Sequence, residues 1–297
     1  MPGRSAIQVY MLQRLIGKLR GCATSVFVLA ALVVLFSVGR SGVSAAADQN
    51  PLLRARLLYN QRRYDAAISA ALEARKFPGN QDVADLVLGR SHLERYRESA
   101  NSDDLTAGRD ALRAIHPANL VARDQLDLLI GLGQSLYFEG AFGAAAELWD
   151  SALARAEDLG PAARDRLLDW WASALDRAAQ SRLVEDRDPI YTRILDRTQV
   201  ELGRDPGGAA AAYWHAVASR ALGDLDRAWE AVQAGWLRAL LKIDPDRAAA
   251  MRADLDRLML EVIIPERARK WSGPDFQSSA DLMKAEWDAF KASWIPK

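Results

Sequence analysis

The stretch from Leu132 to Ala152 alternates small and large apolar residues at helical spacing, and it limits the possible folds more than any other feature. These residues are Leu132, Gly133, Leu136, Gly140, Phe142, Ala145, Trp149 and Ala152. The spacing is helical before Gly140 and again after Phe142, which predicts a helix, a tight turn and a second helix. We expect the small Gly133 where the helices approach closely, and the large Trp149 where space between them must be filled.

Similar residues recur at the same spacing elsewhere in the chain. In the first unit they are Ala55, Leu58, Arg62, Tyr64, Ala67, Ala71, Ala74 and Pro78. In the last unit they are Ala216, Ser219, Gly223, Leu225, Ala228, Val232 and Gly235. A second unit opens at Leu88 and Gly89, the latter 34 residues after Ala55, and Arg62 takes the place of the turn glycine in the first unit.

This pattern resembles the tetratricopeptide repeat (TPR), whose period is 34 residues. The resemblance implies an all-α fold, a right-handed superhelix of stacked antiparallel helix pairs. No pair buries its apolar face alone, and stacking several pairs makes one continuous core. We assign the repeats to residues 48–243 and C-terminal capping helices to residues 244–297.

Two units depart from the pattern. In the second unit we expect a polar insertion, Arg95–Asp104, between the helices, with Asp103 and Asp104 solvated. The fourth unit is degenerate, with one helix over Pro161–Gln180, a charged link, and a second helix from Pro189 to Leu202.

The last 54 residues lose the repeat. One helix is expected to end before Pro265, and an irregular connection should follow over Ala268–Gln277. Ser278–Trp294 then reads as an amphipathic helix, with Ser278 and Asp281 as a capping box. Its apolar face consists of Met283, Trp287, Phe290 and Trp294. We interpret it as a cap on the last repeat; the alternative is a docking helix for a partner or a membrane surface, for which basic residues are few.

Residues 1–47 have a basic start, an apolar run over Ala23–Val38 and small residues near Ala45 and Ala47. These features predict a secretory signal cleaved after one of those alanines, or an uncleaved membrane anchor. Either way the body is exported, and we expect the bacterial periplasm or an anchor in the inner membrane. The lone cysteine, Cys22, lies in this segment, so the remainder offers no thiol chemistry.

The charge balance argues against nucleic acid as a partner. The whole chain has 39 basic and 39 acidic residues, and residues 1–47 hold five basic and no acidic ones. The remainder therefore has 34 basic against 39 acidic residues and lacks a basic stripe.

The sequence lacks the usual catalytic and metal-binding motifs. Its histidines, His92, His116 and His215, have no second histidine or cysteine at ligand spacing, so we expect no metal. There is no Gly-x-Ser-x-Gly elbow and no phosphate-binding loop, and we expect neither a cofactor nor enzymatic activity. Paired acids such as Asp103–Asp104 leave open the alternative of an all-α enzyme acting on cell-wall polymers.

The TPR resemblance also implies a binding surface, because in that family the first helix of each pair lines a concave face that holds peptides or partner helices. By position within the units, the implied residues are Arg56, Tyr59, Asn60, Arg90, Gln134, Tyr137, Tyr213, Trp214 and Arg220. Arginine and aromatic residues make strong interface contacts. We expect the three arginines to pair with carboxylates of an extended, acidic or polar segment. The Lys and Asn set of the family's best-defined peptide clamp is absent.

We therefore expect a non-catalytic scaffold or adaptor for protein–protein interaction in a bacterial cell-envelope assembly. Its partner would be a peptide segment or a helix, and it would contact a membrane only through an uncleaved N-terminal anchor. The alternatives are a membrane-anchored assembly factor, a structural subunit of a larger envelope complex, and the enzyme considered above.

Overall fold

The computed structural model describes residues 50–294 apart from 156, 158 and 243. These residues are all-α, with no strand among them, which confirms the predicted fold class. They belong to the compact unit formed by residues 46–297. The predicted signal or anchor, residues 1–47, lies outside the described part of the chain. Within the described part, no helix combines the length and apolar character needed to cross a bilayer.

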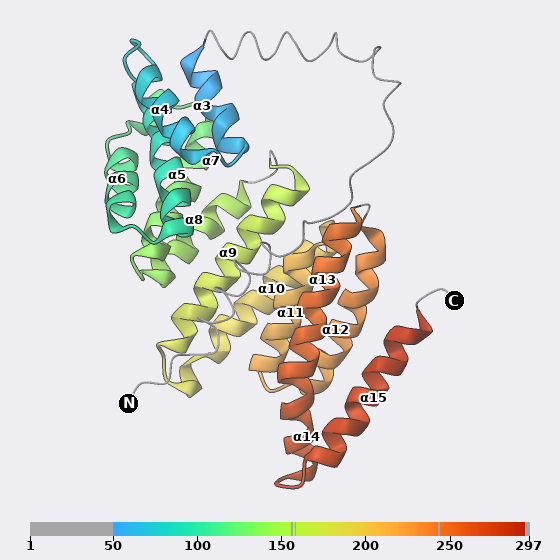
Figure 1. Ribbon diagram of the computed structural model, residues 1–297. Coiled ribbons are helices and arrows are strands. Elements are labelled where there is room, and N and C mark those ends of the chain that lie inside the picture. Colours follow the sequence, from blue (N-terminus) through green and yellow to red (C-terminus); the bar gives the residue numbers. More distant parts are fainter. Residues whose placement is uncertain (1–49, 156, 158, 243, 295–297) are drawn as a thin grey trace, which may run out of the picture. The chain divides into compact units, whose positions relative to one another are not determined.

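The helices follow one another with short connections (Figure 1). They are α3 (Pro51–Asn60), α4 (Tyr64–Ala74), α5 (Gln81–Ser99), α6 (Ser102–Arg113), α7 (Ala122–Phe138), α8 (Phe142–Ala154), α9 (Pro161–Gln180), α10 (Asp188–Arg204), α11 (Ala209–Ala221), α12 (Leu225–Arg238), α13 (Pro245–Leu258), α14 (Ile264–Ser272) and α15 (Gln277–Ser293). Short 3-10 turns cover Pro117–Asn119, Val184–Asp186 and Ala239–Leu241.

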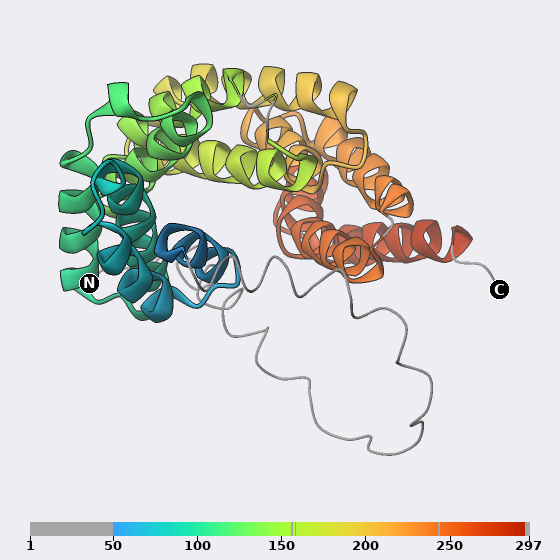
Figure 2. The same ribbon diagram turned by 90° about the horizontal axis from the view of Figure 1, so that it is seen from above.

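Neighbours in sequence are neighbours in space. From α4 to α13 each helix packs against the one before it, which can be followed from blue to red in Figure 2. Contacts also join α3 to α5, α5 to α7, α9 to α11 and α11 to α13. Helices α3, α5, α7, α9, α11 and α13 thus contact the adjacent helix on one side and the next helix but one on another.

The helix–turn–helix predicted around Gly140 is present. Helix α7 ends at Phe138, Gly140 has a φ of +82°, and α8 begins at Phe142. The buried Trp149 of α8 lies on Gly133 of α7, and its indole N–H donates a hydrogen bond of 3.1 Å to the Ile130 carbonyl. A Cβ at Gly133 would come within 2.3 Å of the Trp149 nitrogen. Only glycine permits this approach, as the spacing predicted.

The turn positions predicted for three of the units share a left-handed backbone. The turn residues Gly140 and Gly223 have φ angles of +82° and +79°, and Arg62, at the same place in the first unit, has +61°. A side chain in this conformation costs about 1–2 kcal/mol relative to the right-handed region. The register assigned to the first unit is therefore consistent with its backbone, although its turn residue is not glycine.

The predicted insertion in the second unit is wrong over most of its length. Helix α5 continues to Ser99 and ends at Ala100, whose φ is +56°, and α6 begins two residues later. Asp104 is buried rather than solvated, because Arg95 donates to both of its oxygens at 2.9–3.0 Å and His92 lies 2.8 Å away. The Arg95 guanidinium lowers the pKa of the Asp104 carboxyl. Asp103 is exposed, as expected.

The expected helix end before Pro265 is also wrong. Helix α13 passes into α14 through a π-helical turn, Met259–Ile263, and Pro265 lies in the first turn of α14. Proline lacks the backbone N–H of an i→i−4 hydrogen bond, and the π turn directly before it interrupts the α-helical hydrogen-bond pattern. The chain reverses only at Gly273, where φ is +59°.

Helix α15 begins at Gln277, so Ser278 lies inside it and the predicted capping box does not form. The ring of Trp287 is buried, meets Trp236 of α12 at 6.3 Å and stacks on Phe290 at 5.4 Å. Its indole N–H donates to Asp256 of α13 at 2.7 Å. Trp287 thus fastens α15 to two earlier helices, whereas Trp294 is half exposed.

Replacing Gly133 by alanine should lower the free energy of unfolding by about 1–3 kcal/mol, because the new methyl group must displace the Trp149 ring. Gly143→Ala is the matched control, since a Cβ there has no neighbour within 4 Å. Urea denaturation measures both, and the control should be neutral or slightly stabilising. An equal effect of the two substitutions would contradict the Gly133–Trp149 packing.

Candidate functional site

The predicted binding residues of the first two units lie together, but their arginines are already paired within the chain. One guanidinium nitrogen of Arg56 on α3 lies 2.9 Å from both carboxylate oxygens of Asp124 on α7, and the Asp124 side chain is only 5% exposed. Arg90 of α5 binds Asp127 at 2.5 Å, with its guanidinium 5.1 Å from the centre of the Tyr59 ring. Burial raises the pKa of Tyr59 to about 12.

The third arginine has the same arrangement. Arg220 of α11 donates to both oxygens of Glu266 on α14, one of them at 2.7 Å. This bidentate contact is the main cause of the raised Arg220 pKa. All three arginines expected to meet a partner's carboxylates instead join helices of this chain, and Arg56 does so across 68 positions of sequence.

Two predicted contact residues are buried, which corrects the expectation that they face a partner. Gln134 is 3% exposed and donates to Glu94 at 2.9 Å. Trp214 is 8% exposed and donates from its indole N–H to Asp169 at 2.9 Å. Glu94 thus holds Gln134 of α7 against α5, and Asp169 holds Trp214 of α11 against α9.

The remaining three predicted residues differ in exposure. Tyr137 is partly buried, with its hydroxyl 3.2 Å from Ser173 and its ring centre 5.7 Å from that of Trp149. Tyr213 is partly buried, and Asn60 is exposed. Of the nine predicted residues, Asn60 alone is exposed.

The three histidines have different surroundings. His92 lies beside Asp104, and His116 is exposed, 3.6 Å from Asp82. His215 is buried 3.1 Å from the Thr198 hydroxyl, and burial lowers its pKa to about 4. Within the described part of the chain, no group of three or more His, Cys, Asp or Glu side chains is placed to hold a metal ion.

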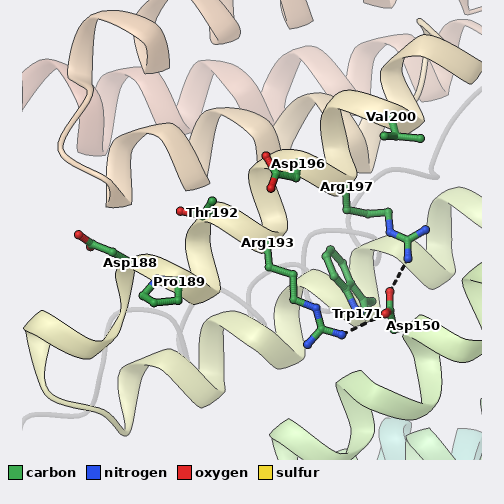
Figure 3. A pocket seen from close by; sticks show the side chains of 9 residues that line it. All are labelled: Asp150, Trp171, Asp188, Pro189, Thr192, Arg193, Asp196, Arg197 and Val200. Atoms are coloured by element: carbon green, nitrogen blue, oxygen red, sulfur yellow. Dashed lines mark hydrogen bonds and ion pairs between the residues drawn. The ribbon is translucent and has the colours of Figure 1, made fainter.

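A surface groove of about 740 Å³ lies between α8 and α10, over α9, and none of the nine predicted residues lines it. Figure 3 shows its lining, which consists of Asp150, Trp171, Asp188, Pro189, Thr192, Arg193, Asp196, Arg197 and Val200. Both α8 and α10 pack against α9, so the helix between them supplies the floor.

Ion pairs connect the two walls of this groove. Arg193 and Arg197 extend from α10 toward Asp150 of α8 (Figure 3), at 3.0 and 2.5 Å, and Arg193 also binds Glu147 at 2.6 Å. Both guanidinium groups lie 5.8 Å from the centre of the Trp171 ring. Ion pairs therefore join the two walls across the groove.

The floor residue has an unmatched donor. Trp171 is fully buried, yet its indole N–H has no hydrogen-bond partner in the described part of the chain. A buried donor without a partner costs about 1–3 kcal/mol, so native structures rarely keep one without reason. The groove thus combines an aromatic floor, an unsatisfied donor and charged walls.

The sequence contained part of this signal. Trp170 and Trp171 stand out in the degenerate fourth unit, and Arg193 and Arg197 are spaced to share one face of a helix. Their shared partner, Asp150, lies 43 positions before Arg193 in another unit, so the spacing of residues does not reveal it.

Comparison with models of known protein families and with curated proteins found no match to this chain.

Replacing Arg56 by alanine should lower the free energy of unfolding by about 1–3 kcal/mol, because the buried Asp124 carboxylate loses its cation. Asn60→Ala, at an exposed position of the same helix, should change the free energy of unfolding by less than about 0.5 kcal/mol. Thermal or urea denaturation compares the two. An Arg56→Ala protein as stable as the control would show that Arg56 is free to meet a partner.

Unfolding should also depend on pH through His215. The unfolded side chain binds a proton near pH 6.5 and the folded one near pH 4. Its contribution, about 3 kcal/mol, is complete above pH 6.5 and is lost as the pH falls toward 4. The free energy of unfolding should fall more steeply over this range in the native chain than in a His215→Gln variant. The same pH dependence of the free energy of unfolding in both proteins would contradict the lowered pKa of His215.

Proposed function

We propose that this chain is a non-catalytic scaffold that binds a protein segment in the groove between α8 and α10. The observation that carries the proposal is the unsatisfied Trp171 N–H at the floor of an open groove. A segment with backbone carbonyls has acceptors for such a donor, and it has side chains for the charged walls.

The lining residues favour binding over catalysis. Asp150 accepts hydrogen bonds from Arg193 and Arg197, so its carboxylate oxygens are already occupied within the chain. Thr192 is exposed, and the lining of the groove includes no histidine that could activate its hydroxyl as a nucleophile. The groove therefore offers recognition groups without a matched acid and base.

The proposal includes the TPR-like arrangement, a right-handed superhelix of stacked helix pairs. Three observations support it. The turn positions share a left-handed backbone, small residues face large ones within the pairs, and alternate helices contact one another. Helices stacked in this way form an extended surface on which grooves between second helices of neighbouring pairs are accessible.

The place of action is proposed from the sequence of residues 1–47. We propose export, with the protein in the bacterial periplasm or anchored at the inner membrane, as part of a cell-envelope assembly. A structural subunit of a larger envelope complex is the related alternative.

The proposal is tested by blocking the groove. Thr192 is exposed and lines it, so Thr192→Trp should fill it without disturbing the core. Affinity purification of the full chain from its native source, with mass spectrometry, should enrich proteins that the Thr192→Trp variant loses. Asn60→Trp on α3 is the control and should retain them.

Far-UV circular dichroism checks that both variants stay folded. Enrichment that is unchanged by Thr192→Trp and lost with Asn60→Trp would contradict the groove assignment. Hydrolysis of a cell-wall polymer by the purified protein would contradict the non-catalytic function.

A further inference from the structure

The charges around the α8–α10 groove do not cancel. Its acidic side chains are Glu147 and Asp150 on α8 and Asp188 and Asp196 on α10, against Arg193 and Arg197. The two arginines are occupied by the two α8 carboxylates. The α10 carboxylates are exposed and make no ion pair with another described residue, so the groove has two unneutralised negative charges.

The two free carboxylates are spaced along one helix. Asp188 and Asp196 are eight positions apart on α10, which corresponds to a rise of about 12 Å. Two side chains about four residues apart in an extended segment are separated by a similar distance. An extended chain lying along α10 therefore matches this spacing.

The floor provides an independent indication of a ligand. The buried Trp171 N–H needs an acceptor, and the Arg193 guanidinium, which lies 5.8 Å from the centre of the ring and is 37% exposed, would have to shift for a segment to reach it. A backbone carbonyl between the two anchor residues of an extended segment is an acceptor of this kind. An anionic segment also has acceptors, but it would meet the uncompensated carboxylates of α10.

We propose that the groove binds an extended, basic protein segment, in which two Lys or Arg side chains pair with Asp188 and Asp196 and a backbone carbonyl accepts from Trp171. This inference rests on the proposed function and defines its partner by charge and conformation. The proposed partner is basic, whereas the sequence predicted an acidic or polar segment that would pair with Arg56, Arg90 and Arg220. Those three arginines are neutralised by carboxylates of this chain.

The test uses the full chain and two fluorescent peptides of matched length and apolar content. One carries two lysines about four residues apart, and the other carries glutamates at the same positions. Fluorescence anisotropy should detect binding of the lysine peptide and at least tenfold weaker binding of the glutamate peptide. The Asp188→Asn/Asp196→Asn double variant should bind the lysine peptide about tenfold more weakly.

The matched control is the Asp275→Asn/Glu286→Gln double variant, which changes the net charge equally at exposed positions outside the groove. It should bind the lysine peptide as the native chain does. In ¹⁵N-labelled protein the Trp171 indole N–H resonance, identified by its loss in Trp171→Phe, should shift when the lysine peptide is added.

Three results would overturn the inference. Equal binding of both peptides, blocked by Thr192→Trp, would reject the basic preference while leaving the groove as a protein-binding site. Failure of both peptides to bind, or binding without a shift of the Trp171 resonance, would reject this occupant. The co-purification experiment with Thr192→Trp then decides the proposed function separately.

Discussion

The close approach of paired helices at glycine is the contact on which the rest of the structure depends. Gly133 accommodates the Trp149 ring, and a Cβ at Gly89 would meet Leu112 at 2.7 Å. Gly235 has a similar place against Leu255, at 3.0 Å. Because the backbones can approach, large side chains such as Trp149 fill the space between helices. Buried clusters extend through all the described helices in this way.

Ion pairs also join helices of this chain. On the first helices of the pairs, Arg56, Arg90 and Arg220 bind carboxylates of neighbouring helices, so that surface is largely satisfied within the chain. Between α8 and α10 the same kind of contact crosses an open groove, and the Trp171 donor beneath it remains unmatched. The candidate site thus arises where ion pairs bridge two helices that do not pack closely.

The sequence was a good guide to two segments in which the determining interactions are local. The α7–turn–α8 unit follows from Gly133, Gly140 and Trp149, all within a few helical turns, and the helix over Pro161–Gln180 has the bounds predicted for it. The partners of Arg56 and Arg193 lie 68 and 43 positions away, and no local pattern indicates them. For the same reason the fold class was predictable, whereas the groove and the burial of Gln134 and Trp214 were not. The helix end predicted before Pro265 was wrong for a different reason. A proline ordinarily ends a helix, whereas here a π turn precedes it and the helix continues.

The most direct measurement of the central claim, that a partner segment occupies the α8–α10 groove, is site-specific photo-crosslinking in the native cells. A photoreactive amino acid placed at Thr192 should join the protein to a partner, and the same group at Asn60 should not. Mass spectrometry of the crosslinked peptide should locate basic residues beside the attachment point. Crosslinks formed at Asn60 and absent at Thr192 would contradict the account.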